Sequence, residues 1–157
     1  MYIFLLRHGD ALQQGYDYVN RPLSTHGEEQ AGLAASFLEK MSISIDAIFN
    51  SFPLRAKQTA NIVNHKLHIR NFNETEYLIP GTDHRQLFNE LNKLSCNAVL
   101  LVGHEPYLST LISLLISGLR KSQVILNKGS LAFIEGHIPI QLGSGLLRWL
   151  LSPECMK

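Results

Sequence analysis

The residues with the greatest potential for chemistry are two histidines, His8 and His104, and two arginines, Arg7 and Arg55. A neutral imidazole is a nucleophile or a proton carrier near neutral pH. A guanidinium is permanently charged and presents several N–H donors in one plane, which matches the oxygens of a phosphoryl group. If the four side chains meet in one place, they form a pocket in which an imidazole attacks a phosphoryl group held by arginines.

Three short hydrophobic segments must bring these residues together. Residues 2–6, 46–50 and 98–102 are continuous apolar runs, which is typical of central strands covered on both faces of a sheet. Each run is followed within a few residues by one or two of the four basic side chains. Ligands of open α/β sheets bind at the carboxyl ends of the strands. We therefore expect the arginines and histidines to converge at that edge.

Helical patterns lie between and after these runs. Thr25 and Glu28 have the spacing of a capping box, and Pro53 and Pro106 are suited to the first turns of two further helices. A shorter helix is expected over residues 84–94. Strands and helices that alternate in this way indicate an α/β fold, a three-layer α/β/α sandwich with a mostly parallel central sheet. We expect one domain over the whole chain, with two last strands over residues 130–135 and 146–151.

Composition narrows the classes of function. The 157 residues are 45% hydrophobic, and 14 Lys and Arg balance 13 Asp and Glu, so we expect no general affinity for nucleic acid or acidic membranes. The two cysteines are too few for a disulfide framework, and Cys96 is not followed by the Cys-x5-Arg loop of a cysteine phosphatase. The apolar start is too short for a signal peptide, and residues 108–119 make only about half a membrane span. We expect a cytoplasmic protein.

Four ordered motifs carry a resemblance to a known family. They are Arg-His-Gly-Asp-Ala at 7–11, Arg-Pro-Leu-Ser-Thr at 21–25, Ser-Phe-Pro-Leu-Arg-Ala at 51–56 and Gly-His-Glu-Pro at 103–106. The chain resembles the histidine phosphatase superfamily over nearly its whole length, and within it the short SixA-type phosphohistidine phosphatases. The resemblance implies a phosphoglycerate mutase-like fold.

The resemblance also implies a role for each central residue. His8 is expected to be the nucleophile that accepts the phosphoryl group and then passes it to water. Arg7 and Arg55 are expected to bind the phosphoryl oxygens, and their charge favours the neutral form of His8. His104 is expected to donate a further hydrogen bond. No metal or other cofactor is expected, because the arginines supply the positive charge that magnesium supplies in kinases.

Two further candidates are less central. Arg21, in the loop after the first strand, is expected either to reach the phosphate or only to brace that loop. Acid phosphatases place their general acid directly after the second histidine, and Glu105 occupies that position here, although it is equally suited to capping the helix that follows. The remaining histidines are expected to be solvated: His26, His65, His68, His84 and His137.

Whether a general acid is present bears on the substrate class. General acid catalysis typically contributes about 10²–10⁴-fold, and a phosphoramidate needs it less than an ester does. We therefore predict a metal-independent protein-phosphohistidine phosphatase that acts on a histidine-containing phosphotransfer domain or a similar carrier. A phosphomonoesterase for a small phosphorylated metabolite is the alternative within the superfamily, and a non-catalytic phosphate-binding module is the alternative of another class. We expect the chain to be a monomer.

Overall fold

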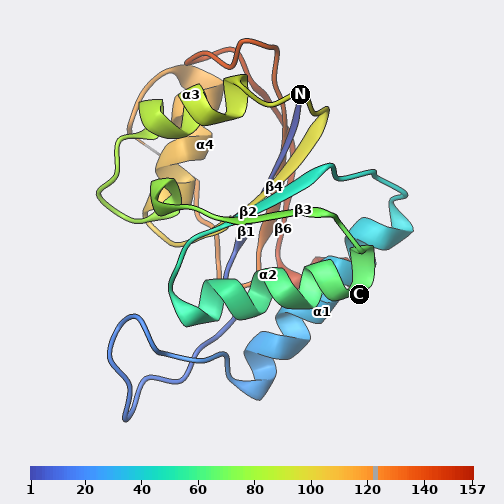
Figure 1. Cartoon of the computed structure of the whole chain (residues 1–157), viewed down its shortest axis with the longest axis vertical. Coiled ribbons are helices and arrows are strands. Elements are labelled where there is room, and N and C mark those ends of the chain that lie inside the picture. The colour runs from blue at the N-terminus through green and yellow to red at the C-terminus, as the bar shows by residue number, and fades with distance from the viewer. Residues whose placement is uncertain (122–123) are drawn as a thin grey trace.

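A six-stranded sheet in the order β3-β2-β4-β1-β5-β6 forms the middle layer of the molecule (Figure 1). The computed structural model describes residues 1–121 and 124–157. Strands β1, β2, β3 and β4 pair in parallel, whereas β5 pairs antiparallel with β1 and β6 pairs antiparallel with β5. The strands are β1 Tyr2–Arg7, β2 Ala47–Asn50, β3 Asn71–Glu74, β4 Ala98–Gly103, β5 Leu131–Glu135 and β6 Leu146–Leu151.

Helices cover both faces of the sheet, as predicted. Helices α1 and α2 pack on one face, and α3 and α4 pack on the other (Figure 1). This arrangement confirms the three-layer α/β/α sandwich. None of the helices within the described residues is long and apolar enough to cross a lipid bilayer. The helices are α1 Thr25–Lys40, α2 Leu54–Leu67, α3 His84–Asn92 and α4 Tyr107–Ser117, with short 3₁₀ turns at Glu76–Leu78 and Pro153–Met156.

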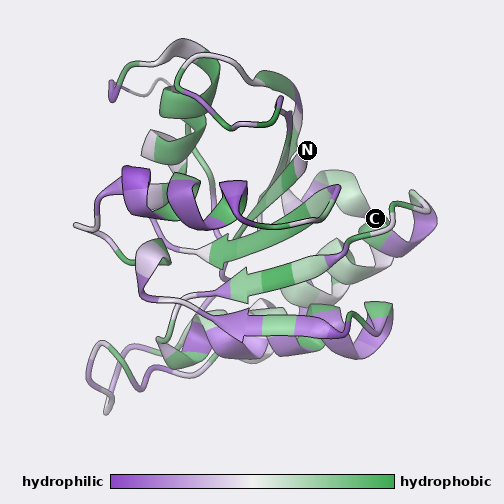
Figure 2. Ribbon diagram, turned by 45° about the horizontal axis from the view of Figure 1, so that its top comes forward, coloured by the Kyte–Doolittle hydropathy of each residue, from purple (hydrophilic) through white to green (hydrophobic). Residues whose placement is uncertain are grey.

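The alternation of side chains along β1 explains why its sequence is continuously apolar. Ile3 and Leu5 belong to the hydrophobic cluster under α3 and α4, whereas Phe4 and Leu6 belong to the cluster under α1 and α2. All four are fully buried, because a central strand with helices on both faces has no side in water. Strand β4 behaves in the same way, and Figure 2 shows the middle of the sheet as hydrophobic.

The helix starts differ from the sequence predictions by one residue. Ser24, not Thr25, caps α1, because its backbone is extended and its side chain accepts a hydrogen bond from the amide of Gly27. The capping box predicted from Thr25 is therefore wrong. Pro53 and Pro106 occupy the cap positions of α2 and α4 rather than their first turns. Neither cap position needs an N–H for the helix ladder, so proline is tolerated there.

The start of α1 touches the loop after β1 backbone to backbone. A Cβ atom on Gly27 would overlap the carbonyl group of Asp10, and one on Gly9 would overlap Gly27. This contact holds the loop that carries His8 against α1. Only glycine allows the two backbones to approach so closely.

We expect Gly27→Ala to lower the free energy of unfolding by about 1–3 kcal/mol, because the added methyl group forces two backbone segments apart. Gly32→Ala in the same helix is the control. A Cβ there meets no atom within 4 Å, so the change should raise stability by roughly 0.5–1 kcal/mol through helix propensity. Urea denaturation of both variants measures the difference. Equal effects of the two changes would contradict the close contact.

Candidate active site

The four central residues predicted from the sequence line one cleft of about 200 Å³ at the carboxyl ends of the parallel strands. Arg7 is the last residue of β1 and His8 follows it, while His104 follows β4. Arg55 lies in the first turn of α2, which begins shortly after β2. The amide of His8 donates to the carbonyl of Gly103 at 3.1 Å, so the ends of β1 and β4 hold the two histidines at one level.

Hydrogen bonds assign a tautomer to His8. Its side chain is 7% exposed, and Nδ1 lies 2.7 Å from the carbonyl oxygen of Gly9. A carbonyl only accepts, so Nδ1 carries the proton and Nε2 carries the lone pair. Arg55 Nε donates to that Nε2 at 3.1 Å. The ring nitrogen that carries the lone pair is therefore held by a cation that lines the cleft.

The surroundings of His8 keep its ring neutral. Its pKa is lowered from 6.5 to about 3, mainly by burial and also by the charges of Arg55, Arg7 and Lys128, while the hydrogen bond to Gly9 opposes this shift. The arginines thus act in the predicted direction, but burial is the larger cause. His8 is therefore a neutral imidazole near neutral pH, with its single proton on Nδ1.

His104 faces His8 across the cleft, with 4.8 Å between the ring centroids. Its Nδ1 accepts from Arg55 Nη2 at 3.3 Å, so Nε2 carries the proton and donates to the Ser51 hydroxyl at 2.6 Å. Burial, then His8 and then the arginines lower the pKa of His104 to about 2. In this arrangement the ring is neutral, and its lone pair on Nδ1 accepts from Arg55. It can donate to a phosphoryl oxygen only after Nδ1 takes up a proton, which a bound dianion favours.

Arg55 connects both histidines to the rim of the cleft. Its guanidinium is 4% exposed, bonds to the two rings through Nε and Nη2, and donates from Nη1 to the carbonyl of Tyr18 at 2.6 Å. The Tyr18 ring covers it, with 4.4 Å between the guanidinium carbon and the ring centroid. Thr59, one turn later in α2, accepts from the amide of Gly9 and donates to the Arg55 carbonyl. Thr59 thereby links the loop after β1, which carries His8, to the first turn of α2, which carries Arg55.

Arg7 keeps part of its donor capacity free. Its Nη1 donates to the carbonyl of Leu126 at 2.7 Å, which fixes the guanidinium. Its Nε is buried and has no hydrogen-bond partner within the described part of the chain. A buried donor without a partner is costly, so an oxyanion bound at this point relieves that cost.

Arg21 lies at the outer wall of the cleft, as one of its lining residues. Its guanidinium carbon is 5.9 Å from the Tyr18 ring centroid, and its Nε is buried with no partner among residues 1–121 and 124–157. The geometry is compatible with both predicted roles, because the side chain both borders the cleft and packs on the rim loop.

Glu105 also lines the cleft, beside Arg7. Its Oε2 accepts from the Ser109 hydroxyl at 2.5 Å, whereas Oε1 is buried without a partner among the residues described. Burial raises the pKa of this carboxyl, and Ser109 and Arg7 partly offset that rise. A carboxyl that is raised in pKa and has one oxygen unpaired is suited to carrying a proton.

Sequence reasoning missed several residues around the cleft. Lys128 is a further cation in the wall of the cleft, and its Nζ lies 2.5 Å from Asp10 Oδ1. Tyr18, Ser51 and Thr59 position the arginine and the histidines. Ser51 lies within the third motif, which gave a signal, whereas no sequence pattern given above pointed to Tyr18, Thr59 or Lys128.

His84 is not solvated, and the prediction for it was wrong. It is 5% exposed and stacks on Tyr107, with 4.0 Å between ring centroids. It lies in the first turn of α3, where that helix packs against the start of α4, so the two rings bury each other. Burial lowers the pKa of His84. It does not line the cleft.

The arrangement can bind and activate a phosphate-sized anion. Four cations and two neutral imidazoles line the cleft, and Glu105 is the single carboxylate among its described lining residues. No group of three His, Cys, Asp or Glu side chains within residues 1–121 and 124–157 is arranged to hold a metal ion.

Comparisons with known proteins agree with this chemistry. The sequence model of the histidine phosphatase superfamily (branch 1) matches residues 3–78. Phosphohistidine phosphatase SixA of Escherichia coli (strain K12) is 27% identical over 161 residues, covering 100% of this chain and 97% of that protein. An uncharacterised protein of Mycobacterium tuberculosis is 32% identical over 115 residues, 71% of this chain and 70% of its own.

A solved structure extends the similarity to the fold. The protein histidine phosphatase SixA complexed with tungstate superimposes with a TM-score of 0.90 at 27% identity, and all of each chain is covered. The predicted phosphoglycerate mutase-like fold is thereby confirmed. The motifs, the fold and these relatives lead to one assignment: the chain belongs to the histidine phosphatase superfamily and is a phosphatase.

Proposed function

We propose that the chain removes the phosphoryl group from phosphohistidine on another protein, either a histidine-containing phosphotransfer domain or a similar carrier. The observation that carries this proposal is the neutral His8 ring, whose Nε2 faces a cleft walled by arginines. Its similarity to SixA phosphohistidine phosphatase favours the same class of substrate.

The first step is transfer of the phosphoryl group to His8. The lone pair of His8 Nε2 forms a bond to phosphorus while the P–N bond of the substrate breaks. The leaving imidazole keeps the electron pair of that bond and takes a proton from solvent water, so it departs as a neutral ring. Arg7 and Arg55 bind the oxygens that carry the charge during transfer. Arg55 must release Nε2 for this, and it can do so because it remains held by Tyr18.

The second step regenerates the site. Water attacks the phosphorus, the bond from phosphorus to His8 Nε2 breaks, and the electron pair returns to the ring. One proton of the water stays on the phosphate oxygen and the other is released, so inorganic phosphate and neutral His8 are the products. The proton stays on Nδ1 throughout and remains hydrogen bonded to the carbonyl oxygen of Gly9, which keeps the ring in one orientation.

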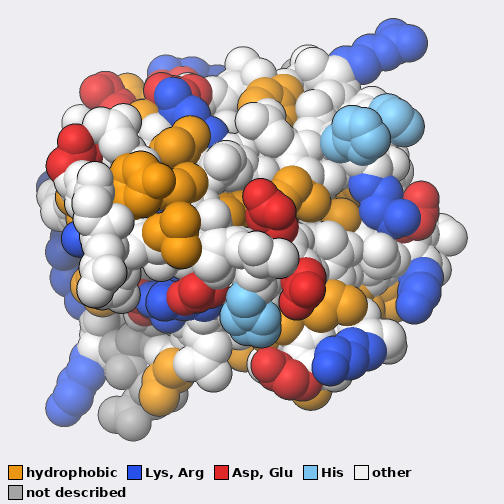
Figure 3. Space-filling view, turned by 90° about the horizontal axis from the view of Figure 1, so that it is seen from below, with side chains coloured by type: hydrophobic (Ala, Val, Ile, Leu, Met, Phe, Trp, Pro, Cys, Tyr) orange, Lys and Arg blue, Asp and Glu red, His pale blue; other side chains and the backbone are white. Residues whose placement is uncertain are grey.

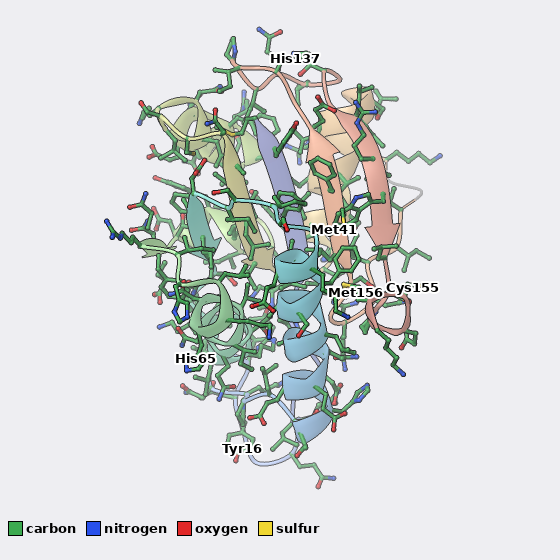
Figure 4. The ribbon with its side chains drawn as sticks, turned by 90° about the vertical axis from the view of Figure 1, so that its right-hand side faces the viewer. Tyr16, Met41, His65, His137, Cys155 and Met156 are labelled. Carbon is green, nitrogen blue, oxygen red and sulfur yellow. The ribbon has the colours of Figure 1, made fainter. Side chains whose placement is uncertain are left out.

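The loop beside the cleft supports a protein substrate. Leu12, Tyr16, Tyr18 and Val19 are each 38–46% exposed, although they are large and hydrophobic. Hydrophobic side chains gather on the side of the molecule that carries this loop (Figure 3), and Tyr16 lies at its outer end, beyond the start of α1 (Figure 4). Exposed apolar groups around a polar cleft are typical of a surface that binds another protein.

Phosphate release from two substrates tests the proposal. A phosphohistidine-bearing phosphotransfer domain and p-nitrophenyl phosphate are compared at equal enzyme concentration, with a metal chelator present. We expect rapid release from the protein and slow cleavage of the ester. Efficient ester cleavage without protein dephosphorylation would move the function to small-molecule esters. No release from either substrate would contradict the proposed reaction.

One observation favours a second candidate, hydrolysis of a phosphomonoester on a small metabolite. The raised pKa of Glu105 and its unpaired oxygen suit a general acid, which an alkoxide leaving group requires. We propose that Glu105 supplies this proton when the leaving group is poor.

Substrates that differ in leaving group test Glu105. We expect Glu105→Gln to lower kcat/KM for an alkyl phosphate such as phosphoserine by about 10²-fold or more, because the amide cannot donate a comparable proton. Turnover of p-nitrophenyl phosphate and of phosphohistidine protein should fall less than about tenfold, since their leaving groups need less help. Ser109→Ala keeps the carboxyl and serves as the control. An equal loss on all three substrates would mean that Glu105 only supports the fold.

A further inference from the structure

Lys128 lies in a segment that is fastened to the end of β1. Arg7 Nη1 donates to the carbonyl of Leu126 at 2.7 Å, and the amide of Gly129 lies 3.2 Å from the Arg7 carbonyl and 3.1 Å from that of His8. Gly129 has a φ of +73°, which glycine adopts without strain. The backbone on both sides of Lys128 is therefore fixed beside His8, and only the four-carbon side chain separates its ammonium group from that anchored backbone.

The ammonium group of Lys128 is paired with the carboxylate of Asp10 at the edge of the cleft. Its Nζ lies 2.5 Å from Asp10 Oδ1, and the other carboxylate oxygen of Asp10 accepts from the Ser24 hydroxyl at 2.7 Å. The amide of Asp10 donates to Gln30 at 2.8 Å. Lys128 lines both the cleft and an adjoining hollow, whereas Asp10 lines only the hollow. Lys128 thus stands at the boundary between the two, close enough for its charge to lower the pKa of His8.

The ion pair of Lys128 with Asp10 can be exchanged for a contact between Lys128 and a bound phosphoryl group. The side chains of Lys128 and Asp10 are 37% and 33% exposed, so water screens their attraction. A phosphoryl group in the cleft carries up to two negative charges, against one on Asp10, and lies among walls that exclude part of the solvent. Arg7 and Arg55 cannot respond in the same way, because backbone carbonyls fix their guanidinium groups.

We propose that Lys128 is an additional substrate-binding cation, held by Asp10 while the cleft is empty and passed to the phosphoryl oxygens when substrate binds. The inference rests on the proposed function only in that the cleft takes a phosphoryl group. It makes Asp10 a competitor of the substrate for Lys128. Removing the competitor and removing the cation must then have opposite effects on affinity.

Oxyanion binding without turnover tests this. Inorganic phosphate and tungstate are titrated into the whole chain by calorimetry at low ionic strength, for the parent, Lys128→Met and Asp10→Asn. We expect Lys128→Met to weaken binding by about tenfold, which is the loss of one charge-assisted contact. We expect Asp10→Asn to tighten binding about threefold or more, because the amide still accepts from Ser24 but no longer holds the ammonium. The double variant should bind like Lys128→Met.

The outcomes separate this inference from the proposed reaction. Weaker binding in both single variants would show that the pair only braces the loop, and unchanged binding in Lys128→Met would show that the ammonium never reaches the anion. Either result would overturn the inference and leave the proposed reaction untouched. If the parent bound neither phosphate nor tungstate, both proposals would fail. Thermal unfolding of each variant checks that a loss of binding is not a loss of fold.

Discussion

His8→Asn is expected to abolish phosphate release while the cleft still binds oxyanions. An asparagine of similar size fills the position but has no ring nitrogen to attack phosphorus, so turnover of any phosphorylated substrate should fall by about 10³-fold or more. Arg7 and Arg55 remain in place, because their anchors are the carbonyls of Leu126 and Tyr18 and not His8. Rapid-quench phosphate release and tungstate calorimetry on the same preparation measure the two properties.

Parent and His8→Asn proteins should also differ in their acid stability. His8 has a pKa of about 3 in the folded chain against a usual value of 6.5, so between these pH values the unfolded chain binds a proton that the folded chain does not. Stability is therefore lost as the pH falls through that window, at up to roughly 1.4 kcal/mol per pH unit for such a group. Asparagine does not titrate, so the variant should lose stability less steeply. His104 keeps its own contribution in both proteins.

Turnover that survives in His8→Asn would contradict the proposed nucleophile. If oxyanion binding were lost together with turnover, and the variant were still folded, His8 would be needed for binding and its role in attack would stay untested by this variant. His8→Ala, which leaves space for added imidazole, then distinguishes the two: rescue of turnover by imidazole is expected only if the missing group is the attacking nitrogen.

The central strands were predictable because burial dictates their sequence. A strand with helices on both faces must be apolar at every position, and β1 and β4 are. Strand β3 was not predicted, since its sequence Asn71–Glu74 is polar and mostly exposed at the edge of the sheet. Its position comes from pairing with β2, a long-range contact that leaves little trace in a polar tetrapeptide.

The residues of the candidate site also fall into those that the sequence predicts and those that it does not. Arg7 ends a buried strand and His8 and His104 directly follow buried strands, so the rule that ligands bind at strand ends was enough to predict that they meet. Lys128 reaches the same cleft from a segment with no periodic pattern, and hydrogen bonds of Gly129 to distant backbone place it there. His84 was misjudged because an isolated histidine in a polar helix gives no sign that Tyr107 will stack on it. Contacts between segments far apart in sequence decide both cases.

Substitutions of Arg55 test how much of the reaction depends on its charge and how much on its hydrogen-bonding geometry. Arg55 contacts Nε2 of His8 and Nδ1 of His104, and it is nearly fully buried. We expect Arg55→Met to lower kcat/KM by about 10²–10³-fold, the usual cost of one donor to a developing oxyanion. The pKa of His8 should rise as well, because a charge that lowers it is gone.

The rise in the pKa of His8 should move the acid limb of the pH profile in one direction. The acid limb of kcat/KM reports protonation of His8 in the free enzyme, so the limb of Arg55→Met should lie at higher pH than that of the parent. Burial still acts on the ring, so the limb should stay below the usual imidazole value of 6.5. Profiles on p-nitrophenyl phosphate between about pH 3 and 8 allow the comparison, because ionisation of the substrate is common to all variants.

Arg55→Lys separates the two contributions of this residue. Lysine keeps the positive charge but cannot contact His8, His104 and the Tyr18 carbonyl at once, since its ammonium is a single point and not a planar fork. Turnover should fall with Arg55→Lys, while the acid limb should stay close to that of the parent. If Arg55→Met and Arg55→Lys gave the same limb, the charge of Arg55 would not control the protonation of His8. Burial alone would then account for the neutral nucleophile, and the arginine would act only on the phosphoryl oxygens.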